Sequence, residues 1–367
     1  MKQSGRPLAK PLAGTPCRTF SLRAFRIAAR ERVDDFERTS AKPLRATSIM
    51  LPLDPAPEKP ASSPEKLRRE KEFVLSKCRY FVDAQVWPIQ ELNPEGWLDN
   101  FEASELPFAV HLLNQFQYFS KRVTNALLEG ALMEMSRHLV PVAASADTAG
   151  ARWEDFLGSV IVTYPTGEKP RATDSGHTFA RMARQILEFP ESRILGPAAA
   201  LEYLLTNGPR PVLFVDDFLG TGRQFVTTWH REYEFQGEQW SFETAQEAKP
   251  FSAYYLPLVA ATQGMSALQQ YCPKVQCLPA HALPDEYSAL HPESFIWPSD
   301  AREAGQQMIQ QASVRAGVPE TNGQSDKDWQ GFGKLGLCIA FEHGVPDATL
   351  PLFYWEENGW SPLVRRT

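Results

Sequence analysis

The sequence predicts an α/β protein whose mainly parallel sheet is flanked by helices, and three observations support that prediction. The 367 residues are 43% hydrophobic, which is enough to bury a full core. After Trp153, short runs of β-branched and aromatic residues alternate with segments of helical spacing. Such alternation is typical of βαβ units, in which helices cover both faces of a parallel sheet. Before Trp153 the apolar spacing is helical, which adds an N-terminal helical cap.

Residues 1–64 form a region of a different kind. Residues 1–50 carry 11 Lys or Arg against 4 acidic residues, although the whole chain has a net charge of −6. The stretch "FSLRAFRIAAR" resembles a transit peptide or a nucleic-acid-binding arm. We favour a disordered basic tail followed by a proline-rich linker at 51–64, and a true start at Met50 is a second interpretation. Contact with nucleic acid is expected only through this tail.

Residues 65–150 are expected to form an N-terminal helical region. Apolar residues recur there every three or four positions, notably in "PFAVHLLNQFQYFSKRVTNALLEGALMEMSRHL". This spacing predicts two or three amphipathic helices that pack against the rest of the chain. Residues 151–367 are then the α/β domain.

Within that domain the strands and helices are expected to alternate. The segments with strand composition are 159–164, 211–218, 251–262, 275–280 and 335–343, the last of which follows a long polar stretch from 281 to 334. The segments with helical spacing are 176–189, 198–208, 224–236 and 265–273.

Composition favours a cytoplasmic protein with no membrane contact. Five cysteines make no disulfide framework, which fits a reducing compartment. No apolar run approaches 18 residues, and no leader of secretory type precedes a cleavage site.

The stretch "PVLFVDDFLGTGRQF" places two carboxylates and a glycine loop after a buried strand. Ligands of open parallel sheets bind beyond the carboxyl ends of the strands, where Asp216 and Asp217 are expected. Gly220 and Gly222 let the backbone turn sharply before a helix, whose first N–H groups can hold a phosphate. Carboxylates beside a phosphate cradle indicate a sugar phosphate, with the amides of 219–224 around the phosphate and the acids on ribose hydroxyls or Mg²⁺.

Two common phosphate-binding motifs are absent from this stretch. A Walker A loop needs Lys-Ser or Lys-Thr after its last glycine, where this chain has Arg223 and Gln224. A dinucleotide fingerprint needs a third glycine at the position of Phe225.

The apolar run, the two acids and the Gly-Thr-Gly loop (Gly220–Gly222) resemble the signature of the phosphoribosyltransferases, which bind phosphoribosyl pyrophosphate (PRPP). The resemblance implies a type I-like phosphoribosyltransferase fold and bound Mg²⁺. It places Asp216 and Asp217 on the ribose hydroxyls or the metal, and Thr221 and Gly222 on the 5′-phosphate. The full set expected around the phosphate is Leu219, Gly220, Thr221, Gly222, Arg223 and Gln224.

The loop departs from that signature at three positions. Gly220 stands where many purine-using members carry an acid suited to proton transfer with the base. Gln224 replaces a Thr or Ser that grips the phosphate, and Arg223 stands where Lys is common. Arg223 can still neutralise a phosphate, but transfer to a conventional nucleobase is in doubt.

The C-terminal stretch "FEHGVPDATLPLFYWEENGWSPLVRR" narrows the resemblance. Together with "TDSGH" at 173–177, it is similar to the divergent PRTase-CE family of bacterial conflict systems, over roughly Trp97 to Arg366. Membership would imply a part in antiphage defence, in some cases with retrons, and partner proteins of such a system.

Two further groups of residues are candidates for the site. In the loop "PTGEKPRATDSGH", Lys169, Arg171, Ser175, Gly176 and His177 suit a pyrophosphate or a supporting role, although an ordinary surface loop with a helix cap is about as plausible.

The turn after the last strand brings His343, Asp347 and Thr349 to a strand end, where we expect an acceptor side; the alternative is a rigid proline turn. The aromatic residues around that turn are expected in the core rather than on a base.

Three functions remain to be compared. The favoured one is transfer of phosphoribosyl to an unidentified acceptor, in which the protein aligns the groups and stabilises charge on the sugar. The alternative is a sensor that binds a nucleotide or ribose phosphate without turnover, favoured by Gly220 and Gln224. A metal nuclease that uses Asp216 and Asp217 is disfavoured, because no third ligand is evident. We reject a zinc site at Cys272, Cys277, His281 and His291, because their spacing fits no standard site.

Overall fold

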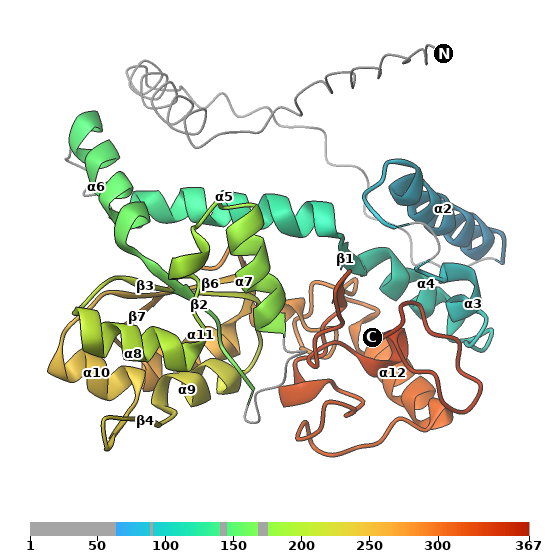
Figure 1. Cartoon of the computed structure of the whole chain (residues 1–367). Coiled ribbons are helices and arrows are strands. Elements are labelled where there is room, and N and C mark those ends of the chain that lie inside the picture. Colours follow the sequence, from blue (N-terminus) through green and yellow to red (C-terminus); the bar gives the residue numbers. More distant parts are fainter. Residues whose placement is uncertain (1–63, 89–90, 140–144, 168–174, 367) are drawn as a thin grey trace, which may run out of the picture. The chain divides into compact units, whose positions relative to one another are not determined.

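The computed structural model describes residues 64–88, 91–139, 145–167 and 175–366 (Figure 1). The predicted basic tail and nearly all of the linker lie outside these residues, as do Lys169 and Arg171. Apart from Ser145–Thr148, the described residues belong to one compact unit.

A five-stranded parallel sheet forms the centre of the α/β part, which confirms the predicted fold class. Its strands are β2 (Ile161–Thr163), β3 (Val212–Leu219), β6 (Ala253–Ala261), β7 (Val275–Cys277) and β8 (His281–Leu283). The order is β2-β3-β6-β7, and β8 continues beside β6 where β7 ends. The long central strands β3 and β6 are almost wholly apolar, as expected for strands buried on both faces.

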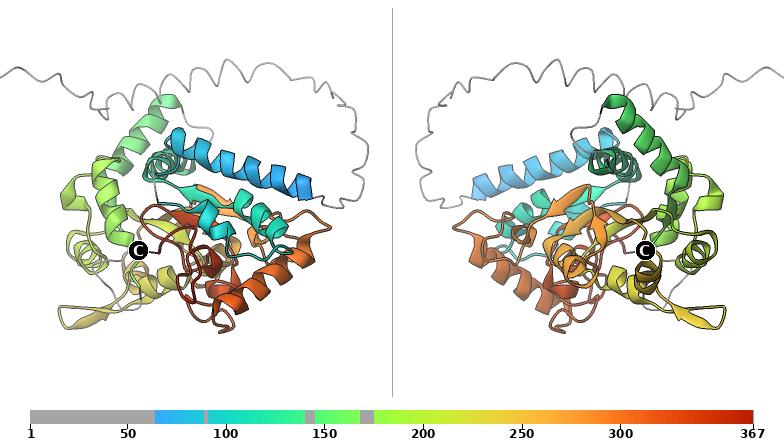
Figure 2. Two further views of the ribbon diagram at one scale, coloured as in Figure 1. Left: turned by 90° about the vertical axis from the view of Figure 1, so that its right-hand side faces the viewer. Right: turned by 90° about the vertical axis from the view of Figure 1, so that its left-hand side faces the viewer.

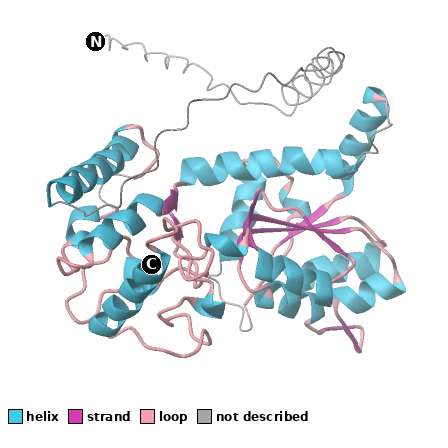
Figure 3. Ribbon diagram, turned by 180° about the vertical axis from the view of Figure 1, so that it is seen from behind, coloured by secondary structure: helices cyan, strands magenta, loops and turns pink. Residues whose placement is uncertain are grey.

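Successive residues of the strands face two different cores, because side chains alternate across a sheet. Val162, Leu213 and Tyr254 pack in one core, whereas Ile161, Val212 and Ala253 pack in the other. The first core is covered by α5 (Lys121–Leu139), α6 (Ala146–Ser159) and α7 (Ser175–Gln185). The second is covered by α8 (Pro197–Asn207), α9 (Arg223–His230), α10 (Phe242–Ala248) and α11 (Thr262–Tyr271). Figure 3 shows helices on both sides of the sheet.

A third core joins the N-terminal helices to the C-terminal end of the chain. Its helices are α2 (Pro64–Asp83), α3 (Pro94–Leu98), α4 (Leu106–Gln115) and α12 (Arg302–Ala316). The Trp97 indole stacks on Phe353, and it donates to the Leu352 carbonyl at 2.6 Å. The aromatics Phe353, Tyr354 and Trp355 are buried, as predicted.

Three elements differ from the sequence-based expectation. The predicted helical block contains a short strand, β1 (Gln117–Phe119), which pairs in parallel with β9 (Ile339–Phe341) outside the five-stranded sheet. α12 forms within the polar stretch that suggested no element, because Met308, Ile309 and Ala312 give it a narrow apolar face.

The helix expected to reach residue 236 ends at His230. A hairpin of β4 (Tyr233–Phe235) and β5 (Glu238–Trp240) follows it, and Figure 2 shows this hairpin, in yellow, extending away from the helices. The turn residues Gln236 and Gly237 both have positive φ, as a two-residue hairpin turn requires. The short 3₁₀ helices are η1 (Glu191–Arg193), η2 (Asp285–Tyr287), η3 (Phe332–Lys334) and η4 (Pro351–Phe353).

In the described part of the chain, no helix has both the length and the apolar character needed to cross a membrane.

Candidate functional site

Strand β3 carries both acids toward the carboxyl edge of the sheet. Asp216 is still within the strand, where it pairs in register with Pro257 of β6, and the strand continues to the buried Leu219. The ladder omits Asp217 and resumes at Phe218. Both acids therefore lie within β3, before its carboxyl end, rather than beyond it.

Asp216 is a buried residue of the fold. Its side chain is 1% exposed, its Oδ2 accepts a hydrogen bond from the Tyr255 hydroxyl at 2.8 Å, and its Oδ1 accepts one from the Asp217 amide at 3.0 Å. Burial, followed by the neighbouring charge of Asp217, raises the pKa of Asp216 well above its usual value. Both carboxylate oxygens of Asp216 are thus bonded within the fold, and its predicted contact with a ribose or a metal stays a prediction.

Asp217 is the accessible acid, with 16% of its side chain exposed. Its Oδ2 lies 2.7 Å from His343 Nε2, and its Oδ1 accepts a hydrogen bond from the Phe218 amide at 2.8 Å. Burial acts to raise the pKa of Asp217, but the hydrogen bond and charge of His343 and the other hydrogen bonds outweigh it, so the pKa is lowered. Two predicted site residues that are far apart in sequence are thus brought together.

The Gly-Thr-Gly loop leads directly into α9. Gly222 has φ +81°, in the left-handed region that favours glycine, and it precedes the helix without a side-chain cap. Gly222 offers no side chain to cap the helix, and the Arg223 amide donates to Thr221 Oγ1 at 3.5 Å. A helix N-terminus that begins in this way can bind a phosphate. Arg223 is exposed at the first helical position, where Gln224 follows it half-buried.

Two other segments pack closely against this loop. A Cβ added at Gly222 would lie 2.9 Å from the Cβ of Ala267, and one added at Gly264 would collide with the Gly220 carbonyl, so the first turns of α11 lie against the loop. A Cβ at Gly333 would collide with the Thr221 methyl group. The segment 331–336, which we call the covering segment, therefore lies on the loop from another side.

The loop after β2 is fixed to α9. The Thr166 amide donates to Thr228 Oγ1 at 2.9 Å, and the Thr228 hydroxyl donates back to the Thr166 carbonyl at 3.0 Å. Arg231 donates to Thr166 Oγ1 and to the Gly167 carbonyl. These bonds hold the start of the predicted pyrophosphate loop beside the helix that begins at the Gly-Thr-Gly loop.

The other end of that predicted loop is the start of α7. Ser175 and His177 lie in its first turn, and Gly176 is buried against Tyr164, where a Cβ would collide with the Tyr164 ring. Close packing is therefore a reason for glycine at this position.

Asp347 and Thr349 make no hydrogen bond to Asp217, although Asp347 lies close enough for the charge of Asp217 to contribute, after burial and Asp326, to the raised pKa of Asp347. The Asp347 carboxylate forms an ion pair with Arg366 and is about half exposed. Thr349 is fully buried, and its hydroxyl donates to the Ile339 carbonyl at 2.7 Å, which ties the turn to β9. Of the three residues expected on the acceptor side, His343 is the one that contacts the acids.

The described residues do not by themselves form a Mg²⁺ site. Both oxygens of Asp216 are bonded inside the core, and the His343 imidazole lies on Asp217 Oδ2, where a cation would bind. No group of three or more His, Cys, Asp or Glu residues among those described is placed to hold a metal. The accessible donor set is one carboxylate, so we assign no chemical step to Mg²⁺.

The cysteines named as zinc candidates serve as buried thiols. Cys272 is buried and Cys277 is partly buried, and burial raises the pKa of each thiol to about 12.

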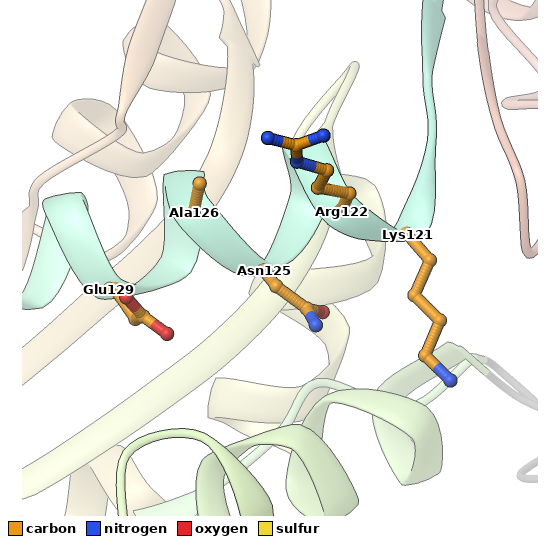
Figure 4. Close-up of a pocket in the computed structure, with 5 residues that line it drawn as sticks. All are labelled: Lys121, Arg122, Asn125, Ala126 and Glu129. Carbon is orange, nitrogen blue, oxygen red and sulfur yellow. The ribbon is translucent and has the colours of Figure 1, made fainter. Parts of the chain in front are cut away.

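A cavity of about 500 Å³ lies elsewhere, along α5, lined by Lys121, Arg122, Asn125, Ala126 and Glu129 (Figure 4). It contains none of the predicted site residues. Its nearest link to the site is the Lys121 amide, which donates to Glu342 Oε2 at 2.6 Å, one residue before His343.

The sequence patterns did not predict three contacts of the site. Tyr255 was seen only as a strand residue, and Gly264 and Gly333 only as ordinary glycines. The density of glycines at 331, 333 and 336 was a signal that the backbone there comes close to another segment.

The sequence model of the PRTase-CE family matches residues 94–366, which is well over half of the chain. No protein with a curated description matches it significantly.

Proposed function

The chain belongs to the PRTase-CE family, and on that premise we propose that it binds PRPP or a related ribose phosphate at the carboxyl edge of β3. The observation that supports the proposal most is the Gly222 turn at φ +81°, which begins α9 without a cap from the side chain of its N-cap residue, a short loop after Asp217.

Each part of the site has a role in this proposal. The amides at the start of α9 hold the 5′-phosphate, and Arg223 adds positive charge beside it. Asp217, the acid with the more exposed side chain, accepts a hydrogen bond from a ribose hydroxyl in this proposal. Contact of Lys169 and Arg171 with the pyrophosphate stays a prediction, because both residues lie outside the described part of the chain, and Mg²⁺ would arrive on the ligand.

The proposed reaction is transfer of the phosphoribosyl group to an acceptor. Such transfer passes through an oxocarbenium-like sugar, so alignment and charge stabilisation supply most of the rate enhancement.

A second candidate function is a sensor that binds the same ligand without turnover. It is favoured by the covering segment, which packs Gly333 on Thr221 and Leu335 near Gly220. Ligand binding would then have to displace this segment, and the displacement would be the signal.

Calorimetric titration of the full-length chain with PRPP in Mg²⁺ tests the proposal, with pyrophosphate release followed in the same sample. Binding with release supports the transferase, and binding without release supports the sensor. Asp217→Asn should weaken binding, whereas the matched control Asp300→Asn, at an exposed acid, should not. Failure of the wild-type chain to bind PRPP, ribose 5-phosphate or a nucleotide would contradict both functions.

We also propose, from family membership alone, a role in bacterial antiphage defence with partner proteins of the same system. Plaque counts on a host that carries the intact system, compared with the same host carrying Asp217→Asn, test it. Equal plaque numbers with and without the wild-type gene would contradict a defence role.

A further inference from the structure

The Asp217–His343 pair has a geometry that the phosphate-binding role leaves unused. His343 Nε2 lies 2.7 Å from Asp217 Oδ2, at the accessible side of the edge where the ligand is proposed to bind. A ribose-binding acid needs no imidazole partner. The pair therefore calls for a separate explanation.

The hydrogen bond selects the form of the imidazole. An ionised carboxylate only accepts hydrogen bonds, so Nε2 must donate to Asp217 and carry a proton. In the neutral ring, Nδ1 is then the unprotonated nitrogen. Among the described residues Nδ1 has no hydrogen-bond partner, and the side chain is 21% exposed.

Two aromatic side chains pack against the imidazole ring of His343. Phe179 of α7 packs edge-on against it at 5.5 Å between ring centroids, and Phe341 of β9 packs at 5.2 Å. Asp217 is itself fixed by the Phe218 amide at 2.8 Å. A carboxylate that orients an imidazole whose other nitrogen is free is the arrangement of a general base.

We propose that His343 is the general base of the transfer and that the acceptor is an oxygen nucleophile, a hydroxyl group or water. This inference rests on the proposed function and names the acceptor class of the same site. An O–H group needs a base to become nucleophilic, and the loop itself supplies none, because it has Gly220 where many purine-using phosphoribosyltransferases carry an acid.

In the proposed step, the acceptor O–H bond breaks and its proton moves to His343 Nδ1. The oxygen forms a bond to C1 of the ribosyl group, while the C1–O bond to pyrophosphate breaks and its electron pair leaves with pyrophosphate. The imidazolium charge is stabilised by Asp217.

The test uses the full-length chain with PRPP as donor and water or methanol as acceptor. His343→Gln keeps an N–H donor for Asp217 but removes the basic nitrogen. We expect unchanged PRPP affinity and a melting temperature close to that of the wild type, with pyrophosphate release about 100-fold slower or more. The matched control is His281→Asn, at an exposed histidine, which should match the wild type.

A second variant covers the case in which His343→Gln does not fold. In His343→Ala, free imidazole should restore release, because it can enter the space left by the ring. Methanol should be trapped as the methyl ribofuranoside 5-phosphate.

The outcomes separate this inference from the proposed function. If the wild-type chain does not bind PRPP, both the proposed function and this inference are contradicted. Wild-type binding without release overturns the base and leaves the sensor. Release by His343→Gln within threefold of the wild type makes His343 structural, and trapping of amines but not of water or methanol overturns the acceptor class.

Discussion

Asp216 and Asp217 are neighbours in the chain but have opposite protonation preferences. Burial against Tyr255 raises the pKa of Asp216, whereas His343 helps to lower that of Asp217. The structure thus distinguishes the two acids: Asp216 is bonded inside the core, and Asp217 is partly exposed. The chemistry of the pair is divided between a structural acid and an accessible one.

This division predicts different effects of the two asparagine variants. Asp216→Asn should bind PRPP as the wild type does and melt at nearly the same temperature, because the amide fills the same space and can bond the Tyr255 hydroxyl and the Asp217 amide, and burial raises the pKa of the acid it replaces. Asp217→Asn should lower the affinity about 10-fold or more, since it removes the charge that a ribose hydroxyl and His343 both meet. Calorimetry with thermal melts of both variants measures this difference. Equal losses of affinity would show that Asp216 also contacts the ligand.

At the scale of elements, two segments converge on the loop of the candidate site. The Gly-Thr-Gly loop lies between the first turns of α11 and the covering segment, and glycines at 222, 264 and 333 allow the close approach. Asp328 lies just before the covering segment, is fully buried and accepts hydrogen bonds from the Thr321 and Gln330 amides.

Gly333→Ala should destabilise the chain by about 1–3 kcal/mol, because the new methyl group would meet that of Thr221 and φ is +67°. Adding Thr221→Ser, which removes the opposing methyl group, should recover part of the loss. Urea unfolding of the two single variants and the double variant measures the coupling. Strict additivity of the two changes would contradict the contact.

Asp328 should contribute stability that depends on pH. Burial acts to raise its pKa, but the hydrogen bonds from backbone amides outweigh it and the pKa is lowered. A carboxyl group with a lowered folded-state pKa stabilises the fold above its unfolded value of about 4, and this contribution is lost as pH falls through the folded-state pKa. Asp328→Asn should therefore cost about 1–3 kcal/mol at pH 7, and the difference from wild type should shrink below about pH 4. Unfolding free energies measured from pH 7 to pH 3 test this, and a constant difference would contradict it.

The parallel sheet, and the position of the Gly-Thr-Gly loop between a strand and a helix, could be predicted from the sequence because both depend on local patterns. The apolar runs of β3 and β6 and the glycines of the loop are visible in a window of ten residues. The hydrogen-bond partners of the two acids cannot be predicted from such a window. Tyr255 reaches Asp216 through the register of two strands, and His343 reaches Asp217 from a turn far along the chain. Asp216 and Asp217 differ in how deeply their side chains are buried, and the local sequence does not predict this difference.

At the scale of the whole described chain, the helices before the sheet and the turns after it share one core. Trp97 and Trp360 both donate to the Leu352 carbonyl, at 2.6 and 3.0 Å. The pairing of β1 with β9 connects the same two regions, and it places His343 two residues after β9. Packing of the N-terminal helices thereby supports the position of a site residue.

Trp97→Ala should destabilise the chain by about 3–5 kcal/mol, because it opens a cavity in that shared core and leaves a carbonyl with one donor fewer. Tyr80→Ala, at a side chain that is 66% exposed, is the matched control and should stay within about 0.5 kcal/mol. Urea unfolding followed by tryptophan fluorescence measures both. A separate early transition in the Trp97 variant, with the main transition unmoved, would show that the N-terminal helices form an independent domain.

The most direct test of the account is a crystal structure of the full-length chain with ribose 5-phosphate. The account predicts the phosphate within hydrogen-bond distance of the amides of residues 222–224 and a ribose hydroxyl on Asp217, with the covering segment moved off Thr221 as far as the ligand requires. A ligand bound elsewhere, while Gly333 still packs on Thr221, would contradict it.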